Sequence, residues 1–347
     1  MGYYYRRSFA ALACAALSVF VAAQYRVQAQ GAGPEAFYKG RSVNMIIGYS
    51  VGGGYDLYAR VLANHLGKHI PGNPTIVPQN MTGAGSAKAA NYLYSVAPKD
   101  GTVIGTFSRS MAINPLIADA KFDGTKFTWL GSITNDVSTC ISWHTSTIKT
   151  WDDLMKHQFT AGGEGAGADP DIFAQLYKNV FGAKIKLVTG YPGTADVVLA
   201  MERKEVDGLC GISWSTIKAR HSDWLKNKQI NILVQAALKK EPEISHVPLA
   251  TDLTTTPEQL QILKLLLASQ AMARPFAAPP DIPADRKAAL QAAFDKTTND
   301  PEFLKEAETR KLDVNPIPAD QIDALLKELY ATPKDVLAKA ARAISNQ

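Results

Sequence analysis

One local pattern recurs through the first two thirds of the chain and restricts its fold more than any other feature. A short apolar run ends in a cluster of glycines, and an amphipathic helical segment follows. Such runs lie at 43–47, 74–78 and 184–189, and a further run, 102–107, ends at Ser108-Arg109-Ser110. Strands that alternate with helices at this spacing form layered folds with largely parallel sheets. The sequence therefore predicts an α/β fold.

The part of the chain after Leu238 differs, because segments with helical spacing are separated there by prolines. Several of them begin with a proline near the first turn, where its fixed φ suits a helix. The predicted helices span 257–267, 284–297, 301–310, 319–329 and 333–345. With 347 residues, of which 46% are hydrophobic and 20% charged, the chain is long enough for two compact lobes, each with its own core.

The first 29 residues have the pattern of a secretory signal peptide. Arg6 and Arg7 precede an uncharged apolar run at 9–23, and small residues at Val27 and Ala29 suit a cleavage site. Fifteen apolar residues are short for a membrane span, which disfavours an N-terminal anchor. We expect cleavage near Ala29 and a periplasmic protein, with Sec and twin-arginine export both open.

Charge and cysteine content restrict the partners of the mature chain. Removing residues 1–29 takes away three arginines and no acid, which leaves 34 basic and 32 acidic residues, a net charge of +2. This balance, without a basic stripe, disfavours nucleic acid. No later apolar stretch has transmembrane length, so the mature protein is not expected to be membrane-embedded. Cys140 and Cys210 are equally compatible with a disulfide and with two buried thiols.

The glycine clusters stand where α/β folds bind ligands, between the carboxyl end of a strand and the next helix. Backbone N–H groups at helix N-termini are unpaired there and favour an anion. Glycines also let a ligand approach the backbone closely. The clusters are 52–54, 83–85, 165–167 and 190–193. They predict a site for a small anion, and tight turns without a ligand are the alternative.

Several side chains near these loops have two possible roles each. Asp56 suits a helix cap better than a ligand contact. Arg109, just past a strand, could pair with a ligand carboxylate or form an internal salt bridge. Trp214 could form the wall of a pocket or fill the core. Asp169 and Asp171 suit the first turn of a helix first and a ligand contact second.

Catalytic and metal-binding patterns are missing from the sequence. None of the six histidines pairs with serine or cysteine in a motif such as G-x-S-x-G, and neither H-E-x-x-H nor C-x-x-C occurs. No glycine cluster gives a P-loop or a dinucleotide fingerprint. We therefore expect no enzyme, no metal and no cofactor.

The first loop has glycines at 52 and 53, then Asp56, Ala59 and Arg60. This G-G-x-x-D-x-x-A-R pattern resembles the substrate-binding receptors of tripartite tricarboxylate transporters, known as Bug proteins. Their N-x-x-G-A-G is similar to the segment from Asn80 to Gly85, and their D-G-Y-T and N-P are similar to Asp100-Gly101-Thr102 and Asn114-Pro115. The resemblance covers about residues 40–330.

The resemblance implies a two-lobed type II periplasmic-binding-protein fold, each lobe a mainly parallel sheet flanked by helices. Crossings near Asp136 and Leu233 would give a first lobe of 30–136 and 234–347 and a second lobe of 137–233. In this family the first two glycine loops hold a ligand carboxylate and the second lobe selects the ligand. The ligand-binding residues expected on these grounds are Tyr49, Gly52, Gly53, Gly54, Asp56, Thr82, Gly83, Ala84, Gly85, Ser86, Ser108, Arg109, Gly165, Gly167, Ala168, Asp169, Tyr191 and Trp214.

The implied function is capture of a small carboxylate-bearing solute and its delivery to integral-membrane transporter subunits by a monomeric receptor. A sensor that signals to a membrane partner and an enzyme on the same scaffold are the alternatives. The family's G-x-G-S-x-x-H-L departs here to Ala168 for serine and Asp171 for histidine. Acids in the selecting lobe would disfavour a second ligand carboxylate and could favour an amine or a hydroxyl, so the ligand is either an organic acid or amino-acid-like.

Overall fold

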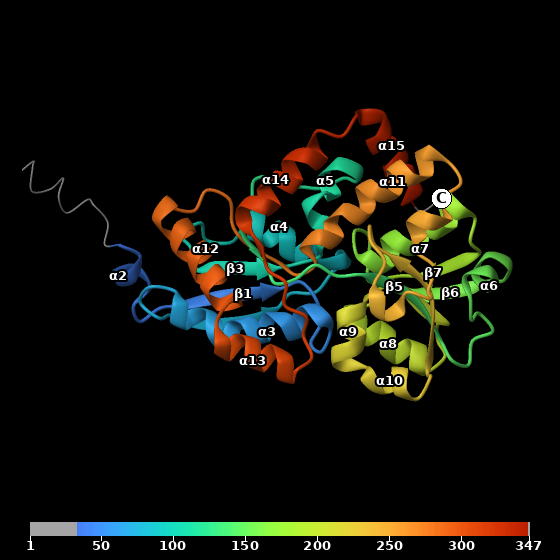
Figure 1. Cartoon of the computed structure of the whole chain (residues 1–347). Helices are drawn as coiled ribbons and strands as arrows, with labels where there is room; N and C mark the ends of the chain where they lie inside the picture. Colours follow the sequence, from blue (N-terminus) through green and yellow to red (C-terminus); the bar gives the residue numbers. More distant parts are fainter. Residues whose placement is uncertain (1–32, 346–347) are drawn as a thin grey trace, which may run out of the picture.

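Two sheets flanked by helices form the two lobes of the molecule (Figure 1). The computed structural model describes residues 33–345, and the expected signal peptide lies outside this range. Within it, one sheet has six strands and the other has five. We call the part built on the six-stranded sheet the first lobe and the part built on the five-stranded sheet the second lobe.

The first lobe brings three of the predicted strands together. Its strand order is β11 (Ile317–Pro318), β4 (Thr128–Ser132), β10 (Pro275–Ala278), β3 (Val103–Thr106), β1 (Ser42–Ile47) and β2 (Thr75–Asn80). β1 pairs in parallel with β2 and β3, with Ile47 opposite Asn80 and Thr106. Because parallel strands end at the same edge of a sheet, the loops that follow these three strands meet at one edge.

The second lobe repeats this arrangement on a smaller sheet. Its strand order is β7 (Ile185–Val188), β6 (Phe159–Gly162), β8 (Gly208–Ser213), β5 (Ser138–Trp143) and β9 (Ile230–Ala236). β6 pairs in parallel with β7 and β8, so the loops after these strands also share an edge.

Most strands of each sheet run in one direction, as predicted, and the sheets are mixed because a few strands run against the others. β10 is antiparallel to β3 and β4, and β5 is antiparallel to β8 and β9. Each of these two strands enters its lobe from the other lobe and therefore runs away from the junction. The strands that carry the glycine loops run toward it, so the entering strand has the opposite direction.

Helices cover the sheets and occupy much of the chain after residue 256. The α-helices are α2 (Pro34–Tyr38), α3 (Gly54–Leu66), α4 (Ala87–Ser95), α5 (Asn114–Ile117), α6 (Trp151–Lys156), α7 (Asp169–Phe181), α8 (Thr194–Glu202), α9 (Trp214–Arg220), α10 (Ser222–Lys226), α11 (Pro257–Leu267), α12 (Ala284–Thr298), α13 (Pro301–Thr309), α14 (Ala319–Tyr330) and α15 (Lys334–Ala343). Short 3₁₀ helices are η1 (Gly67–His69), η2 (Ala84–Ser86), η3 (Arg109–Ala112), η4 (Pro242–Ile244), η5 (Ala250–Leu253) and η6 (Ala268–Met272). Among residues 33–345, no helix combines the length and the apolar composition needed to cross a bilayer.

The five helices predicted for the last part of the chain are confirmed as α11 to α15, and local chemistry explains their starts. The hydroxyl of Thr256 accepts a hydrogen bond from the Gln259 amide at the start of α11, and the carboxylate of Asp300 accepts one from the Glu302 amide at the start of α13. A proline occupies the first position of both helices, where its missing N–H has no helical partner to lose.

The chain passes from the first lobe to the second between β4 and β5, at residues 133–137. β9 continues through Leu233 to Ala236 within the second sheet, and the chain rejoins the first sheet at β10. We therefore propose that the second crossing lies at 268–274, later than the position expected near Leu233. The exact limits of the lobes remain a prediction.

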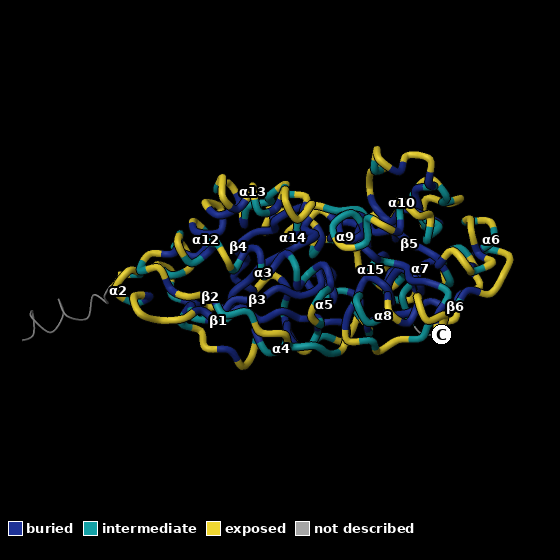
Figure 2. Tube along the Cα trace, turned by 90° about the horizontal axis from the view of Figure 1, so that it is seen from below, coloured by how far each residue is buried: buried dark blue, intermediate teal, exposed yellow. Residues whose placement is uncertain are grey.

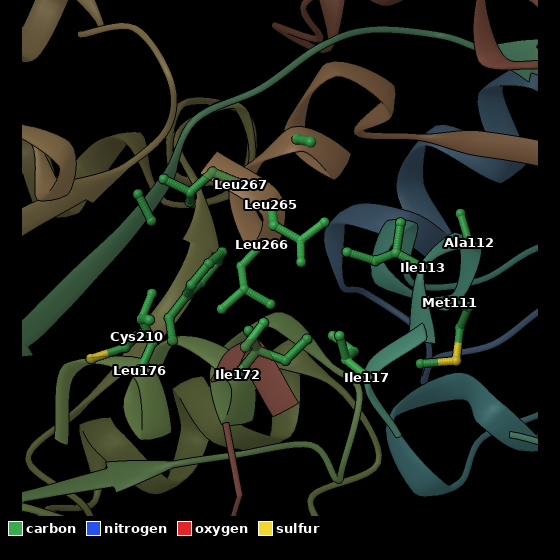
Figure 3. Close-up of a cluster of buried hydrophobic side chains, with 14 of the residues drawn as sticks. Met111, Ala112, Ile113, Ile117, Ile172, Leu176, Cys210, Leu265, Leu266 and Leu267 are labelled. Atoms are coloured by element: carbon green, nitrogen blue, oxygen red, sulfur yellow. The ribbon is translucent and has the colours of Figure 1, made fainter. Parts of the chain in front are cut away.

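Each lobe has a buried apolar cluster of its own, and a further cluster joins the two lobes. Figure 2 shows buried residues continuing through the middle of the molecule from one lobe to the other. In Figure 3, Ile117 of α5 lies beside Ile172 of α7, and the leucines of α11 cover them. Helix α15 packs against α5, α7 and α11. Apolar contacts therefore connect the lobes on this side of the molecule.

Cys140 of β5 and Cys210 of β8 face each other across the antiparallel pair and form a disulfide. Both residues are fully buried. The structure thus favours the first of the two states that the sequence left open for these cysteines.

Candidate functional site

A small cavity lies where the two lobes meet, at the carboxyl ends of β1, β3, β6 and β8. About 20 Å³ is free inside it, which is room for one water molecule. The lining residues from the first lobe and the crossing are Tyr49, Gly54, Tyr55, Ser108, Arg109 and Arg274, and those from the second lobe are Glu164, Asp169, Pro170, Thr194, Gly211, Ile212, Ser213 and Thr216. A solute larger than water enters only if the lobes separate or the lining side chains move.

Arg109 of η3 is the main cationic group that the first lobe presents to this cavity. Its side chain is 1% exposed, and Nε donates to Asp169 Oδ2 over 2.8 Å. Nη2 donates to the same oxygen and to Ser138 Oγ, the latter at 2.6 Å. Burial alone would lower the pKa of Arg109, but the Asp169 carboxylate outweighs burial and raises it. The guanidinium therefore stays charged and joins the two lobes.

One nitrogen of this guanidinium is left over. Arg109 Nη1 is buried and has no hydrogen-bond partner among residues 33–345. A buried donor without a partner costs about 1–3 kcal/mol, more when it is charged, and a native structure rarely keeps one without a reason. This nitrogen can donate a hydrogen bond to a carboxylate or to another acceptor.

Two tyrosines form the aromatic side of the cavity. The rings of Tyr49 and Tyr55 lie 4.8 Å apart between centroids, and the Tyr55 hydroxyl accepts a hydrogen bond from the Arg109 amide at 3.0 Å. Burial is the main cause that raises the pKa of both phenols, so they remain neutral donors at physiological pH. Tyr49 was expected in the site, whereas Tyr55 was not.

Arg274 connects the crossing segments to the second lobe. Its guanidinium is 2% exposed and lies 3.3 Å from Asp136, the partner in the first crossing. It also donates to the hydroxyls of Ser215 and Thr216 at the start of α9. The charge of Arg274 is thus balanced by Asp136, as that of Arg109 is by Asp169.

The acids at the start of α7 are held by the protein itself. Asp169 pairs with Arg109, as described above. Asp171 Oδ2 accepts hydrogen bonds from the amides of Glu164 and Gly165 at 2.6 and 2.9 Å, and its other oxygen accepts one from Thr189. Asp171 therefore fixes the shape of the loop 163–165 and is not among the residues that line the cavity.

The second and third glycine loops pack directly on each other across the lobe junction. The Gly85 amide donates to the Glu164 carbonyl at 3.1 Å. A Cβ at Gly85 would lie 2.7 Å from the Gly165 carbonyl oxygen and 2.8 Å from the Ala168 nitrogen. Only glycine leaves room for this approach, so these loops serve the contact between the lobes.

The predicted site residues fall into two groups. Tyr49, Gly54, Ser108, Arg109 and Asp169 line the cavity. The others lie outside its lining: Gly52, Gly53, Asp56, Thr82, Gly83, Ala84, Gly85, Ser86, Gly165, Gly167, Ala168, Tyr191 and Trp214.

Three of these outlying residues have clear structural roles. Asp56 accepts hydrogen bonds from the Gly52 amide, Arg60 and Asn80, and so holds the first loop. The ring nitrogen of Trp214 donates to Glu243, and its indole packs in the apolar cluster of the second lobe. The hydroxyl of Ser86 accepts a hydrogen bond from the Ser108 amide and so helps to fix the position of Ser108, which lines the cavity.

The sequence interpretation missed the lining residues Tyr55, Glu164, Pro170, Thr194, Gly211, Ile212, Ser213, Thr216 and Arg274. Glu164 and Thr194 lie directly beside the glycine clusters 165–167 and 190–193, where a charged or hydroxyl side chain next to a strand end is a usable signal. Arg274 had no local signal, because it reaches the cavity only through the second crossing. Among residues 33–345, no group of three or more His, Cys, Asp or Glu side chains is placed to hold a metal ion.

Replacing Gly85 by alanine is expected to push the lobes apart without unfolding either. The φ of +59° costs alanine about 1 kcal/mol, and the added methyl also collides with the third glycine loop. Gly182→Ala is the control, because its φ of +80° imposes a similar backbone cost with nothing within 4 Å of the new methyl. Small-angle scattering should show a larger radius of gyration for Gly85→Ala alone. Identical radii would show that this contact does not hold the lobes together.

No protein-family model and no curated protein matches the sequence. Solved structures do match its fold. BugD, a periplasmic binding protein, aligns with a TM-score of 0.70 at 18% identity, over 87% of this chain and 98% of BugD. The chain has the fold of the two-lobed periplasmic binding proteins.

Two further structures with this fold are described together with a ligand. An R. palustris protein with adipate aligns with a TM-score of 0.67 at 18% identity, over 87% of this chain and 97% of its own. MatC from Rhodopseudomonas palustris, with bound malate, aligns with a TM-score of 0.65 at 18% identity, over 86% of this chain and 99% of its own. The two-lobed α/β fold predicted from the sequence is confirmed.

Proposed function

We propose that the protein is a periplasmic solute receptor of the Bug type, which captures a small carboxylate-bearing solute between its lobes and delivers it to a membrane transporter. The observation that carries this proposal is the buried Arg109 guanidinium, with Nη1 unpaired, in a cavity shared by both lobes. Adipate and malate, the ligands named with two structures of this fold, are both carboxylates.

Lobe movement is the mechanism that this geometry supports. With about 20 Å³ free, the cavity has to open before a solute enters. A solute that contacts both lobes then stabilises the closed form by its differential affinity for it. Removal of a signal peptide near Ala29, a periplasmic location and a monomeric receptor without a cofactor belong to the same proposal.

A thermal-shift screen of mono-, di- and tricarboxylates, aromatic acids and amino acids tests the function. A ligand at about 100 times its Kd stabilises the folded state by about 2.7 kcal/mol, which raises Tm by several degrees. The carboxamide of each acid is the matched control, because it keeps the shape and loses the charge. If carboxamides raise Tm as much as their acids do, or if no acid raises it, the carboxylate receptor is the wrong function. Recovery of the acid unchanged separates binding from turnover.

A further inference from the structure

Glu164 is an acidic group of the cavity that has no cationic partner among residues 33–345. It follows β6 in the third glycine loop and is 5% exposed. Its Oε1 accepts a hydrogen bond from the Thr194 hydroxyl at 2.6 Å. No ion pair to it occurs in the described part of the chain, although the other cavity acid, Asp169, is paired.

The backbone around Glu164 is fixed at the lobe junction. Its amide donates to Asp171 Oδ2 at 2.6 Å, and its carbonyl accepts the Gly85 amide of the first lobe at 3.1 Å. These backbone contacts and the Thr194 hydrogen bond to Oε1 together hold the carboxyl group in place when the lobes are closed. A side chain that is already positioned in this way loses little conformational entropy when it binds a ligand group.

The charges around the cavity determine which charged groups a bound ligand can carry. Arg109 is balanced by Asp169 and Arg274 by Asp136, which leaves Glu164 as the cavity acid without a positively charged partner among the described residues. The carboxylates that act electrostatically on Glu164 are Asp169 and Asp171 of α7 and Asp196 of α8. From the first lobe, Tyr49 also interacts with Glu164, which contributes to the raised pKa of the Tyr49 phenol. A second ligand carboxylate would add a like charge, whereas a cationic group would be attracted.

Building on the function proposed above, we propose that the solute is a zwitterion, with its carboxylate on Arg109 and an ammonium group on Glu164. Glu164 would then be the residue that separates amino acids or similar zwitterions from simple organic acids. The acidic positions suspected from the sequence, Asp169 and Asp171, are occupied by the protein's own groups, and Glu164 is the acid left to face a ligand.

The ionisation of Glu164 makes this proposal measurable. Burial is the largest cause that raises its pKa to about 8; the Thr194 hydrogen bond opposes the rise, and the neighbouring carboxylates add to it. Glu164 is thus mostly protonated at neutral pH without a ligand. An ammonium group binds the carboxylate form, so binding releases a proton, and affinity for a zwitterion should rise with pH up to about 8. A simple acid that accepts a hydrogen bond from protonated Glu164 would show the opposite slope.

The test is calorimetric titration with pairs of probes that differ by one ammonium group: L-alanine and propionate, γ-aminobutyrate and butyrate, δ-aminovalerate and valerate, L-leucine and its des-amino acid. We expect at least one zwitterion to bind about 10- to 100-fold more tightly than its partner acid, which is the range for a hydrogen bond to a charged group. Its affinity should rise between pH 6 and 8. Titrations in buffers of different ionisation enthalpy should show proton release.

Glu164→Gln keeps the size of the side chain and removes its charge. We expect this variant to lose the preference for the zwitterion and the rise of affinity with pH, while it binds the simple acid as before. Glu205→Gln, an exposed change in the same lobe, is the control and should behave like the wild type. The pH profile of the wild type decides the question even if Glu164→Gln folds poorly.

The outcomes separate this inference from the proposed function. If simple acids bind as tightly as their zwitterionic partners, with an affinity that is flat or falls with pH, the zwitterion proposal is wrong and the carboxylate receptor stands. A zwitterion preference that survives in Glu164→Gln also overturns it. If no acid binds, either in this titration or in the thermal-shift screen, the proposed function fails, and this inference fails with it.

Discussion

Replacement of Arg109 by glutamine is expected to lower the affinity for a carboxylate solute by about 100-fold or more, measured by calorimetry. Glutamine keeps a hydrogen-bond donor but loses the charge and the free Nη1. The size of the effect comes from burial, because Arg109 is 1% exposed and water screens its charge little.

The same change leaves Asp169 without its cation, and a buried charge without its partner costs about 3–5 kcal/mol. A loss of affinity in Arg109→Gln could therefore come from lobes that no longer close. The double variant Arg109→Gln, Asp169→Asn removes both charges and should recover most of the thermal stability without recovering affinity. Arg203→Gln, an exposed change, should alter neither. Wild-type affinity in the double variant would show that Arg109 does not hold the solute.

Loss of the Cys140–Cys210 disulfide is expected to lower the free energy of unfolding by about 4 kcal/mol. The bond closes a loop with a sequence separation of 70, and the chain-entropy relation for a loop of this length gives a cost of that order when the cross-link is absent. Both cysteines are buried, on the paired strands β5 and β8. The disulfide stabilises the folded protein mainly because it restricts the conformations of the unfolded chain.

Urea unfolding of the oxidised wild type, the reduced wild type and the variant Cys140→Ala, Cys210→Ala measures this effect. Reductant should shift the wild type toward the variant and leave the variant unchanged. A difference below about 1 kcal/mol between oxidised and reduced protein would mean that the cross-link restricts the unfolded chain little.

The fold followed from the sequence where local chemistry sets it. The start of α11 at Pro257 is given by Thr256, Pro257 and the apolar spacing behind them, all within a few residues. The glycine loop before α3 was placed correctly for the same reason, because a strand, three glycines and a helix follow each other directly. Strand direction, in contrast, cannot be predicted from the local sequence. β5 and β10 run antiparallel to their neighbours because the chain enters each of them from the other lobe.

The site was predicted in part, and the limit is again distance along the chain. Arg109 and Tyr49 stand at strand ends and could be named, but whether Arg109 meets a ligand or Asp169 depends on how the lobes close. Trp214 illustrates the opposite case. It follows β8 directly, yet its ring turns to Glu243 and the core, and a sequence cannot show which way the first residue of a helix points.

The most direct measurement is a crystal structure of the protein with the solute that binds best in the screen. Capture between the lobes predicts the solute in the enlarged cavity beside Tyr49 and Ser213, with a carboxylate oxygen within hydrogen-bond distance of Arg109 Nη1. A solute bound outside this cavity, or one inside it that leaves Arg109 Nη1 without an acceptor, would contradict the proposed function.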